Sequence, residues 1–393
     1  MSFKVLLVLM LTALLGWSGY AYSRPLPEIK ATAKVISLKT SQAINLPWPA
    51  YGQGALGALG YGVLETHGQQ KAVPMASLAK VITALAVLKQ KPLALGQTGP
   101  TITINSDDVA IYNSYYNQGG SVVKVEVGEQ LSQYQALQAL LIPSANNMAD
   151  TLARWAFGSM DSYISFANQM LQGLSLQNTK VADASGFSPE SVSSAQDLVK
   201  LGLSAMQNPL IASLVKQEVA ELPVAGKVNN VNWLLGSDGV VGIKTGNTDE
   251  AGGCFLFASQ RNVGGQSLTL IGALMQAPDR NTAIRDARIL IQASDSGFET
   301  VKAVSQGQTV ATYEAPWGAK SEVVAKDDSA MLAWRGASLQ TSAQLNNLTG
   351  SYPVRANTSV GSIKVANGQK TARVSVILKN NLVGPPWHWR IFR

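Results

Sequence analysis

The stretch Ser77-Leu-Ala-Lys-Val-Ile-Thr-Ala-Leu-Ala-Val-Leu-Lys89 places a serine and a lysine at the start of an amphipathic segment. Its apolar side chains recur on one helical face, at Val81, Ile82, Leu85 and Leu88. This spacing predicts a core helix that begins at Ser77. Positions i and i+3 of a helix share a face, so the Lys80 amine can lie beside the Ser77 hydroxyl.

Two more short strings follow downstream. Ser144-Ala-Asn146 begins 67 residues after Ser77, and Lys244-Thr-Gly246 begins 100 residues after Ser144. Each string alone has a structural explanation: Ser77 as a helix cap, Ser144 as a turn residue after Pro143, and Lys244 as a solvated charge at a strand end. The ordered set instead predicts a nucleophile with its base, a second hydroxyl and a cationic anchor.

Lysine is the candidate base for Ser77. A serine hydroxyl needs a base within hydrogen-bond reach, which is usually histidine. The two histidines, His67 and His388, lie in a predicted turn and near the C-terminus. Burial of Lys80, together with repulsion between Lys80 and Lys244, would lower the pKa of Lys80 towards neutrality. The helix N-terminus would let the Ser77 backbone N–H stabilise an oxyanion.

The other motif residues suit a peptide with a free carboxylate. Ser144 offers a hydroxyl for proton relay, and the Asn146 amide can orient Lys80 and bond to a peptide group. Lys244 and Thr245 offer a charge and a hydroxyl to a carboxylate. Gly246 lets an extended substrate lie along the strand edge.

Patterning along the chain predicts a mixed domain followed by a small β-domain. Helices are expected from a Ser132-x-x-Gln135 capping box, over 161–172, after Ser194 and over 281–293. Three β-like runs at 240–245, 254–259 and 267–275 predict an antiparallel meander. We expect a signal peptide or anchor at 1–23, a linker at 24–54, the mixed domain at 55–297 and the β-domain at 298–393.

The N-terminus reads as an export segment. Lys4 precedes an apolar run from Val5 to Leu15, and Ala21-Tyr-Ser23 offers small residues at a possible cleavage site. Val5 to Tyr22 carries no charge and is 18 residues long, which also suits an uncleaved membrane anchor. The protein is therefore expected outside the cytoplasm, either secreted or held on the outer face of the cytoplasmic membrane.

The composition limits which classes of binding partner and cofactor we expect. The formal net charge is +7, but the basic residues are scattered and the chain carries an export segment, which argues against nucleic acid. The single cysteine, Cys254, excludes an intramolecular disulfide and predicts a buried thiol. We find no cluster of metal ligands and no phosphate-binding loop, so no metal or cofactor is predicted.

The chain resembles the D-alanyl-D-alanine carboxypeptidases, the low-molecular-mass penicillin-binding proteins of serine peptidase family S11. The likeness covers about residues 61–298 and includes five strings: Pro74-Met-Ala-Ser-Leu-Ala-Lys80, Leu141-Ile-Pro-Ser-Ala-Asn146, Asp183-Ala-Ser-Gly-Phe-Ser-Pro189, Ser194-Ala-Gln-Asp-Leu198 and Gly242-Ile-Lys-Thr-Gly-Asn-Thr-Asp-Glu-Ala-Gly252. The resemblance implies an α+β, β-lactamase/transpeptidase-like domain, with an antiparallel sheet flanked by helices and a helical subdomain, plus a small C-terminal β-domain.

The resemblance also implies roles for the site residues. Ser77 would form the acyl-enzyme, Lys80 would accept its proton, Ser144 would relay protons and Lys244 would anchor the carboxylate. The backbone of Asn247 would be the second oxyanion donor. The substrate would be the stem pentapeptide of peptidoglycan, which loses its terminal D-alanine, and β-lactams would acylate Ser77.

Two features depart from the family. Its members often use an arginine from the helix after the sheet, but neither Arg280 nor Arg285 aligns cleanly, so neither is assigned. Many members end in an amphipathic membrane-binding helix, whereas this chain ends in Gly384-Pro-Pro-Trp-His-Trp-Arg-Ile-Phe-Arg393. The proline pair and the alternating aromatics argue against such a helix, which leaves the N-terminus as the expected anchor.

Three rival functions use or resemble the same residues. A D,D-endopeptidase of peptidoglycan cross-links would differ only in groove shape. A class A β-lactamase needs a glutamate to activate the deacylating water, and none of Glu190, Glu218 and Glu221 lies in the expected context. A non-catalytic wall-binding module would be expected to have lost part of the trio, which is complete here.

Overall fold

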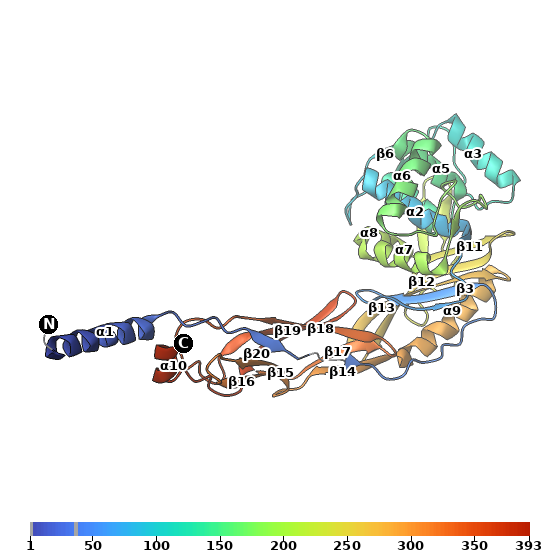
Figure 1. The fold of residues 1–393 in the computed structure, drawn as a ribbon. Coiled ribbons are helices and arrows are strands. Elements are labelled where there is room, and N and C mark those ends of the chain that lie inside the picture. The colour runs from blue at the N-terminus through green and yellow to red at the C-terminus, as the bar shows by residue number, and fades with distance from the viewer. Residues whose placement is uncertain (1–2, 35–37) are drawn as a thin grey trace. The chain divides into compact units, whose positions relative to one another are not determined.

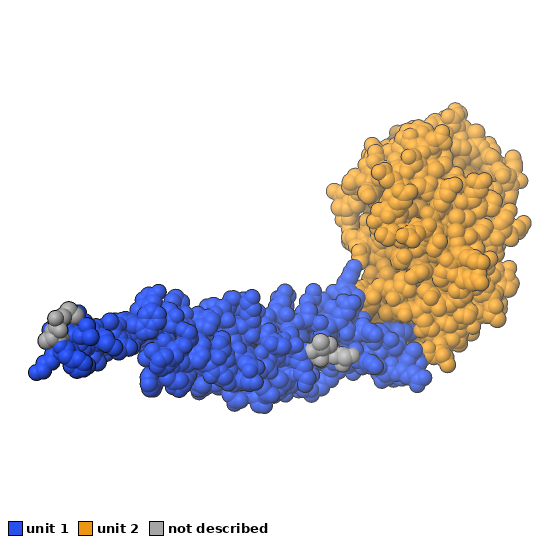
Figure 2. Space-filling model, viewed as in Figure 1, with its two compact units in different colours: residues 1–43, 299–393 blue, residues 44–298 orange. Residues whose placement is uncertain are grey.

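The computed structural model describes residues 3–34 and 38–393, which form two compact units (Figures 1 and 2). Residues 44–298 make up one unit, called here the mixed unit. Residues 1–43 and 299–393 make up the other, called the β-rich unit. The α+β class is confirmed: the mixed unit combines helices with an antiparallel sheet, and the other unit is rich in strands.

A five-stranded antiparallel sheet forms the centre of the mixed unit. Its strands lie in the order β11-β12-β13-β3-β4, with bounds β3 Gln53–Ala58, β4 Gly62–His67, β11 Val240–Thr248, β12 Gly252–Val263 and β13 Gln266–Ala277. Helix α7 (Ala195–Gln207) packs on one face and α9 (Arg280–Ser294) on the other (Figure 1). Both faces of β12 are therefore buried from Gly253 to Ser259, which explains the apolar run around Cys254.

The remaining helices of the mixed unit pack beside this sheet. Their bounds are η1 Ala76–Leu78, α2 Ala79–Gln90, α3 Ser106–Asn117, α4 Gln133–Leu141, α5 Asn146–Phe157, α6 Met160–Gly173, α8 Pro209–Val215 and η2 Asp295–Gly297. The predicted capping box at Ser132 and Gln135 and the cap at Ser194 are confirmed by their hydrogen bonds to the backbone. Ser144 lies on the connection between α4 and α5, as predicted.

Three short strand pairs complete the mixed unit. They are β5 (Val73–Pro74) with β8 (Val192–Ser193), β6 (Thr101–Thr103) with β7 (Gln130–Ser132), and β9 (Val219–Leu222) with β10 (Gly226–Asn229). One hydrophobic cluster joins α2, α4, α5, α7 and the sheet. The start of α2 is thus held between the sheet and the other helices.

The β-rich unit is built on a second, seven-stranded sheet. Its order is β1-β15-β16-β20-β19-β18-β2, and β14 pairs separately with β17. The bounds are α1 Phe3–Ser23, β1 Ala31–Ala33, β2 Leu38–Lys39, β14 Phe298–Val304, β15 Thr309–Glu314, β16 Lys320–Ala325, β17 Ser329–Trp334, β18 Ser338–Leu345, β19 Ser359–Asn367, β20 Lys370–Leu378 and α10 Trp387–Phe392.

Two expectations need correction. The stretch 24–54 is not a plain linker, because β1 pairs with β15, β2 pairs with β18, and Ile29 is buried in the core of the β-rich unit. These strands are too short to show an alternating pattern in the sequence. A helix also forms near the C-terminus, since Pro386 occupies the N-cap of α10, where its missing N–H costs nothing.

Candidate active site

Ser77 lies in the η1 turn that leads directly into α2. The preceding Ala76 has a positive φ of 46°, a strained conformation for a residue with a side chain. Gly186 packs so closely on this turn that a Cβ there would lie 1.9 Å from the Ala76 carbonyl oxygen. Ser77 itself is half-buried, so part of it faces solvent rather than the protein interior.

Lys80 contacts Ser77 directly. Its Nζ lies 2.9 Å from Ser77 Oγ, and it donates to Asn146 Oδ1 at 2.6 Å and to the Ser185 carbonyl at 2.8 Å. The Lys80 side chain has no exposed surface. Burial lowers its pKa to about 7, although the negative charges of Asp183 and Asp150 act in the opposite direction. Near neutral pH this amine can therefore take up the proton of the Ser77 hydroxyl.

A carboxylate network supports the loop that contacts Lys80. Asp183 Oδ2 accepts hydrogen bonds from Ser185 Oγ at 2.7 Å and from the Phe187 N–H at 2.8 Å. The same carboxylate accepts one from Ser191 Oγ at 2.5 Å. These bonds fix the Ser185 carbonyl that accepts from Lys80. Asp183 thus helps to orient Lys80 through the backbone of this loop.

Asp150 lies at the other end of this network. Tyr115 Oη donates to Asp150 Oδ2 at 3.1 Å and lies 3.4 Å from Ser185 Oγ. Burial raises the pKa of Asp150 to about 6, and among the described residues its Oδ1 has no hydrogen-bond partner. Asp150 is therefore a negative charge near Lys80 whose strength changes just below neutral pH.

The second motif brings Asn146 onto Lys80 and places Ser144 in the same turn. Ser144 is almost fully buried and has a positive φ of 69°. Asn146 begins α5, and its N–H donates to the Ser121 carbonyl at 2.7 Å. Within the described chain, no hydrogen bond joins the Ser144 hydroxyl to Lys80 or Ser77. Asn146 thus contacts Lys80 directly, whereas Ser144, two residues earlier in the chain, forms no hydrogen bond with Lys80 among the described residues.

The third motif lies on β11, directly against the η1 turn. A Cβ on Gly246 would lie 3.1 Å from the Ser77 nitrogen and 3.2 Å from the Met75 carbonyl oxygen, so only glycine fits this approach without displacement. Lys244 and Thr245 are buried, whereas Asn247 is exposed at the following position. All three motifs therefore meet at the Ser77 turn.

Three basic side chains lie in this region: Lys80, Lys244 and Arg280. Burial first, and then the charges of Lys80 and Arg280, hold the pKa of Lys244 well below its usual range. Lys244 Nζ donates to the Thr245 carbonyl at 3.0 Å. A carboxylate arriving here would offset this repulsion and favour the charged form of Lys244.

The position of Arg280 in the sequence does not assign it to the site. The structure places its charge beside Lys244. It is the first residue of α9, and its N–H donates to Asn247 Oδ1 at 3.1 Å. The start of α9 can approach the sheet this closely because Gly253 of β12 has no side chain: a Cβ there would lie 2.1 Å from the Asp279 carbonyl oxygen. Among the described residues, the buried Arg280 Nε has no hydrogen-bond partner.

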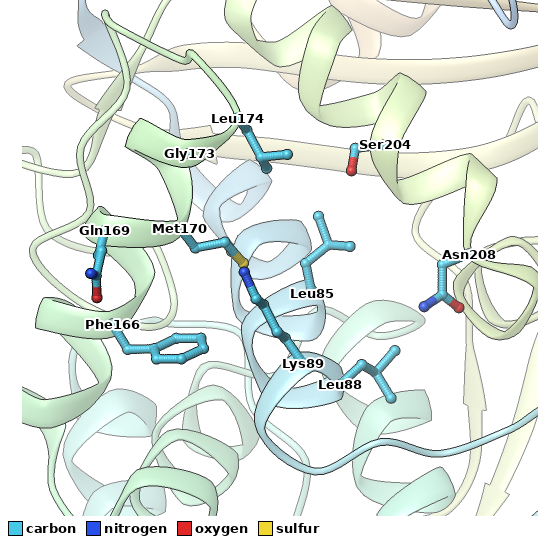
Figure 3. Close-up of a pocket in the computed structure, with 10 residues that line it drawn as sticks. All are labelled: Leu85, Leu88, Lys89, Phe166, Gln169, Met170, Gly173, Leu174, Ser204 and Asn208. Carbon is cyan, nitrogen blue, oxygen red and sulfur yellow. The ribbon is translucent and has the colours of Figure 1, made fainter.

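A large hollow lies elsewhere in the mixed unit. It measures about 570 Å³ and is lined by residues near the C-terminal end of α2, by α6 and by the end of α7. Leu85, Leu88 and Lys89 of α2 face Phe166 and Met170 of α6 across it (Figure 3). None of the predicted site residues lines this hollow, so we assign it no part in the chemistry.

Comparison with known proteins identifies the family of this chain. The family model described as D-alanyl-D-alanine carboxypeptidase, peptidase family S11, matches residues 61–278. The D-alanyl-D-alanine carboxypeptidase DacC of Escherichia coli K12 is 26% identical over 83% of this chain and 82% of its own length. A D-alanyl-D-alanine endopeptidase of Pseudomonas aeruginosa is 28% identical over 54% of this chain and 67% of its own length.

A solved structure extends the likeness to most of the chain. Penicillin binding protein 5 from Haemophilus influenzae matches with a TM-score of 0.62 at 19% identity, over 87% of this chain and all of that one. At 19% identity, this match shows a similar fold and nothing more. Since the family model spans more than half of the sequence, the chain belongs to the D-alanyl-D-alanine carboxypeptidase family, and it is a hydrolase.

Proposed function

We propose that Ser77 is the nucleophile by which this enzyme removes the terminal D-alanine from peptidoglycan stem pentapeptides. The observation that carries the proposal is the 2.9 Å contact between Ser77 Oγ and the fully buried Lys80 Nζ. Neutral Lys80 takes the Ser77 proton as Oγ attacks the carbonyl carbon of the D-Ala-D-Ala bond. The negative charge passes to the carbonyl oxygen.

The backbone of the same region would stabilise that oxyanion. The Ser77 N–H lies where the η1 turn meets Gly246, and the Asn247 N–H is the second proposed donor. Collapse of the intermediate breaks the C–N bond and releases D-alanine, whose amine receives the proton held by Lys80, with Ser144 as the relay. Water then hydrolyses the ester on Ser77 and regenerates the hydroxyl.

Lys244, Thr245 and Arg280 would hold the terminal carboxylate of the substrate. The charges of Lys244 and Arg280 act on each other there, and the buried Arg280 Nε is unpartnered among the described residues. The substrate peptide would lie along β11 as an added strand, beside Gly246. A β-lactam presents a carboxylate and a reactive amide in the same relation, so it would acylate Ser77 as well.

A D,D-endopeptidase that cuts cross-links is the second candidate, since the Pseudomonas aeruginosa relative carries that description. The test compares D-alanine release from diacetyl-Lys-D-Ala-D-Ala with cleavage of a cross-linked muropeptide dimer. A carboxypeptidase releases D-alanine much faster than it cuts the dimer. The opposite ratio would identify an endopeptidase acting through the same Ser77.

A class A-like β-lactamase is not favoured by the placement of the candidate glutamates. Glu190, Glu218 and Glu221 are all exposed, and within the described chain none forms a hydrogen bond with Ser77 or Lys80. Rapid turnover of benzylpenicillin would support that function. A long-lived adduct is the result expected for a carboxypeptidase.

We also infer that the enzyme works outside the cytoplasm, where its substrate lies. Helix α1 is long and apolar enough to cross a membrane, by length and composition. It would direct export as a signal peptide or hold the protein as an anchor. Accessibility of Ser77 to an impermeant fluorescent penicillin in intact spheroplasts tests this location.

A further inference from the structure

Formal charge is divided unequally between the two units (Figure 2). The β-rich unit carries 16 lysines and arginines against 6 aspartates and glutamates, which gives a formal net charge of +10. The mixed unit carries 15 against 18, which gives −3. The positive charge of the chain therefore lies in the unit that does not contain Ser77, where it can attract an anionic partner.

Four neighbouring strands of the β-rich unit carry cations without any acidic residue. Strands β20, β19, β18 and β2 follow one another in the seven-stranded sheet, and β18, β19 and β20 can be followed in Figure 1. Their sequences hold Lys39, Lys364, Lys370 and Arg373 but no aspartate or glutamate. Lys364 is half-buried, and the other three cations are exposed.

The strand register brings three of these cations to one face of the sheet. Lys364 of β19 lies directly opposite Arg373 of β20 on one side and Ser342 of β18 on the other. Lys39 of β2 lies opposite Ser338, four residues before Ser342 on β18. Opposite residues share a face, and so do residues separated by an even number of positions along a strand. We call Lys39, Lys364 and Arg373 the basic face.

The basic face carries a repulsion that this unit does not offset. Like charges directly opposite each other on neighbouring strands are destabilising, as Lys364 and Arg373 are here. Among the described residues neither forms an ion pair with a carboxylate, whereas Lys302 of the same unit pairs with Asp328 at 3.1 Å. Strands β19 and β20 are interior strands, so these charges do not serve to block pairing at a sheet edge. A bound anion would offset the repulsion.

We infer that the basic face binds the free carboxylates of peptidoglycan stem peptides and so holds the protein on the polymer that it trims. The inference rests on the substrate proposed above. Each stem pentapeptide ends in a carboxylate, and hydrolysis of its last amide bond leaves a new carboxylate on the shortened stem. Binding would therefore persist as D-alanine is released. Several weak contacts between cations and carboxylates along one polymer add up to firm attachment.

The first test measures co-sedimentation of the full chain, in a neutral detergent, with purified peptidoglycan sacculi. The variant Lys364→Gln/Arg373→Gln removes two charges from the basic face. The matched control is Lys302→Gln/Lys320→Gln, which removes two exposed and ion-paired charges elsewhere in the same unit. All three proteins keep the same active site, so any contribution of that site to sedimentation cancels.

We expect the basic-face variant to bind sacculi about tenfold more weakly than the wild type, and the control to stay within about twofold. Binding by the wild type should also weaken as salt is added. Equal losses in the two variants would show an effect of net charge alone. That result, or an unchanged affinity in the basic-face variant, would overturn the inference.

The second test identifies the anion without relying on a variant. In one sample the carboxylates of the sacculi are converted to neutral methylamides, and in another any phosphodiester polymer is removed with hydrofluoric acid. Binding by the wild type should fall on amidation to the level of the basic-face variant and should survive the acid treatment. Loss on acid treatment, with binding retained after amidation, would identify a phosphate polymer as the partner and overturn the inference.

Release of D-alanine from soluble diacetyl-Lys-D-Ala-D-Ala separates this inference from the proposed function. Equal rates for the wild type and both variants would show that each protein is folded and that the active site is intact. Equal rates together with equal sedimentation would overturn the inference alone. If no protein released D-alanine but sedimentation still depended on the basic face, the proposed function would fail and the binding of carboxylates would stand.

Discussion

The two units differ in what they bury. Among the described residues, the buried polar side chains of the β-rich unit are Ser321 and Asn367, and neither carries a charge. The mixed unit buries Lys80 at 0% exposure and Lys244 at 1%, and within the described chain neither forms an ion pair with a carboxylate. Burying an unpaired ammonium costs free energy, so its retention indicates chemistry rather than stability. We therefore assign the proposed catalysis to the mixed unit.

The sharpest challenge to this assignment removes the buried amine of Lys80, which we propose as the base. Lys80→Met keeps the volume of the side chain but leaves Ser77 without a proton acceptor. We expect the rate of acylation by benzylpenicillin to fall by about 10²–10⁴-fold, the range for a lost general base. Stopped-flow acylation kinetics measure this effect.

The matched control is Lys89→Met, at an exposed position in the last turn of the same helix. It should acylate at the wild-type rate, because Lys89 lies more than two helical turns from Ser77. Equal losses in the two variants would refute the role of Lys80, provided that circular dichroism shows both proteins folded.

A smaller effect is expected where the cations gather. Arg280→Gln removes the charge beside Lys244 that we assign to the substrate carboxylate. A lost hydrogen bond to a charged group costs about 1.5–3 kcal/mol, so kcat/KM for the peptide should fall about 10–150-fold. Arg285→Gln, further along the exposed side of α9, is the control. An unchanged kcat/KM in Arg280→Gln would remove this residue from the site.

The pH dependence of acylation tests the buried charges one at a time. Lys80 must be neutral to accept a proton, so the acylation rate should rise with pH through about 7. Asp150 raises the pKa of Lys80, and it faces Tyr115 of α3, Asp183 and Arg154 as well. Asp150→Asn should therefore move the rising limb to lower pH.

The control for this shift is Asp161→Asn, at an exposed position in the first turn of α6. Its pH profile should match that of the wild type. A limb that moves to higher pH in Asp150→Asn would contradict the direction of the electrostatic effect. So would a shift of equal size in the control.

The smallest effect on acylation is expected from a core variant of the β-rich unit. Leu378→Ala, at a fully buried position of β20, should reduce the stability of that unit by about 2–5 kcal/mol. Hydrogen exchange resolved by peptide should show faster exchange in β16, β19 and β20. Acylation of Ser77 should keep its wild-type rate, and a parallel loss of acylation would end the division of tasks between the units.

Local patterns predict much of the mixed unit. The caps at Ser132 and Ser194 are short-range hydrogen bonds between residues three apart, so the sequence displays them directly. The β11 to β13 meander follows from consecutive apolar runs separated by glycine turns. These elements depend on residues that lie close together in the sequence. Their patterns can therefore be recognised from the sequence alone.

Contacts between distant residues explain what the sequence does not display. Ser185 serves Lys80 through its backbone carbonyl, which any residue type would offer, and Asp183 acts only by fixing that loop. Arg280 reaches the site because Gly253 lets the start of α9 approach β12. The strand over 31–33 and the α10 helix depend on partners from elsewhere in the β-rich unit, and no periodicity marks them.

The central claim is that Ser77 is activated by Lys80 and is the residue that becomes acylated. Its most direct measurement is intact mass after brief exposure to benzylpenicillin, followed by peptide mapping, for the wild type and for Ser77→Ala. The account predicts a single adduct on the wild type, mapped to Ser77, and no adduct on the variant. An adduct on another serine, or one that persists in Ser77→Ala, would contradict it.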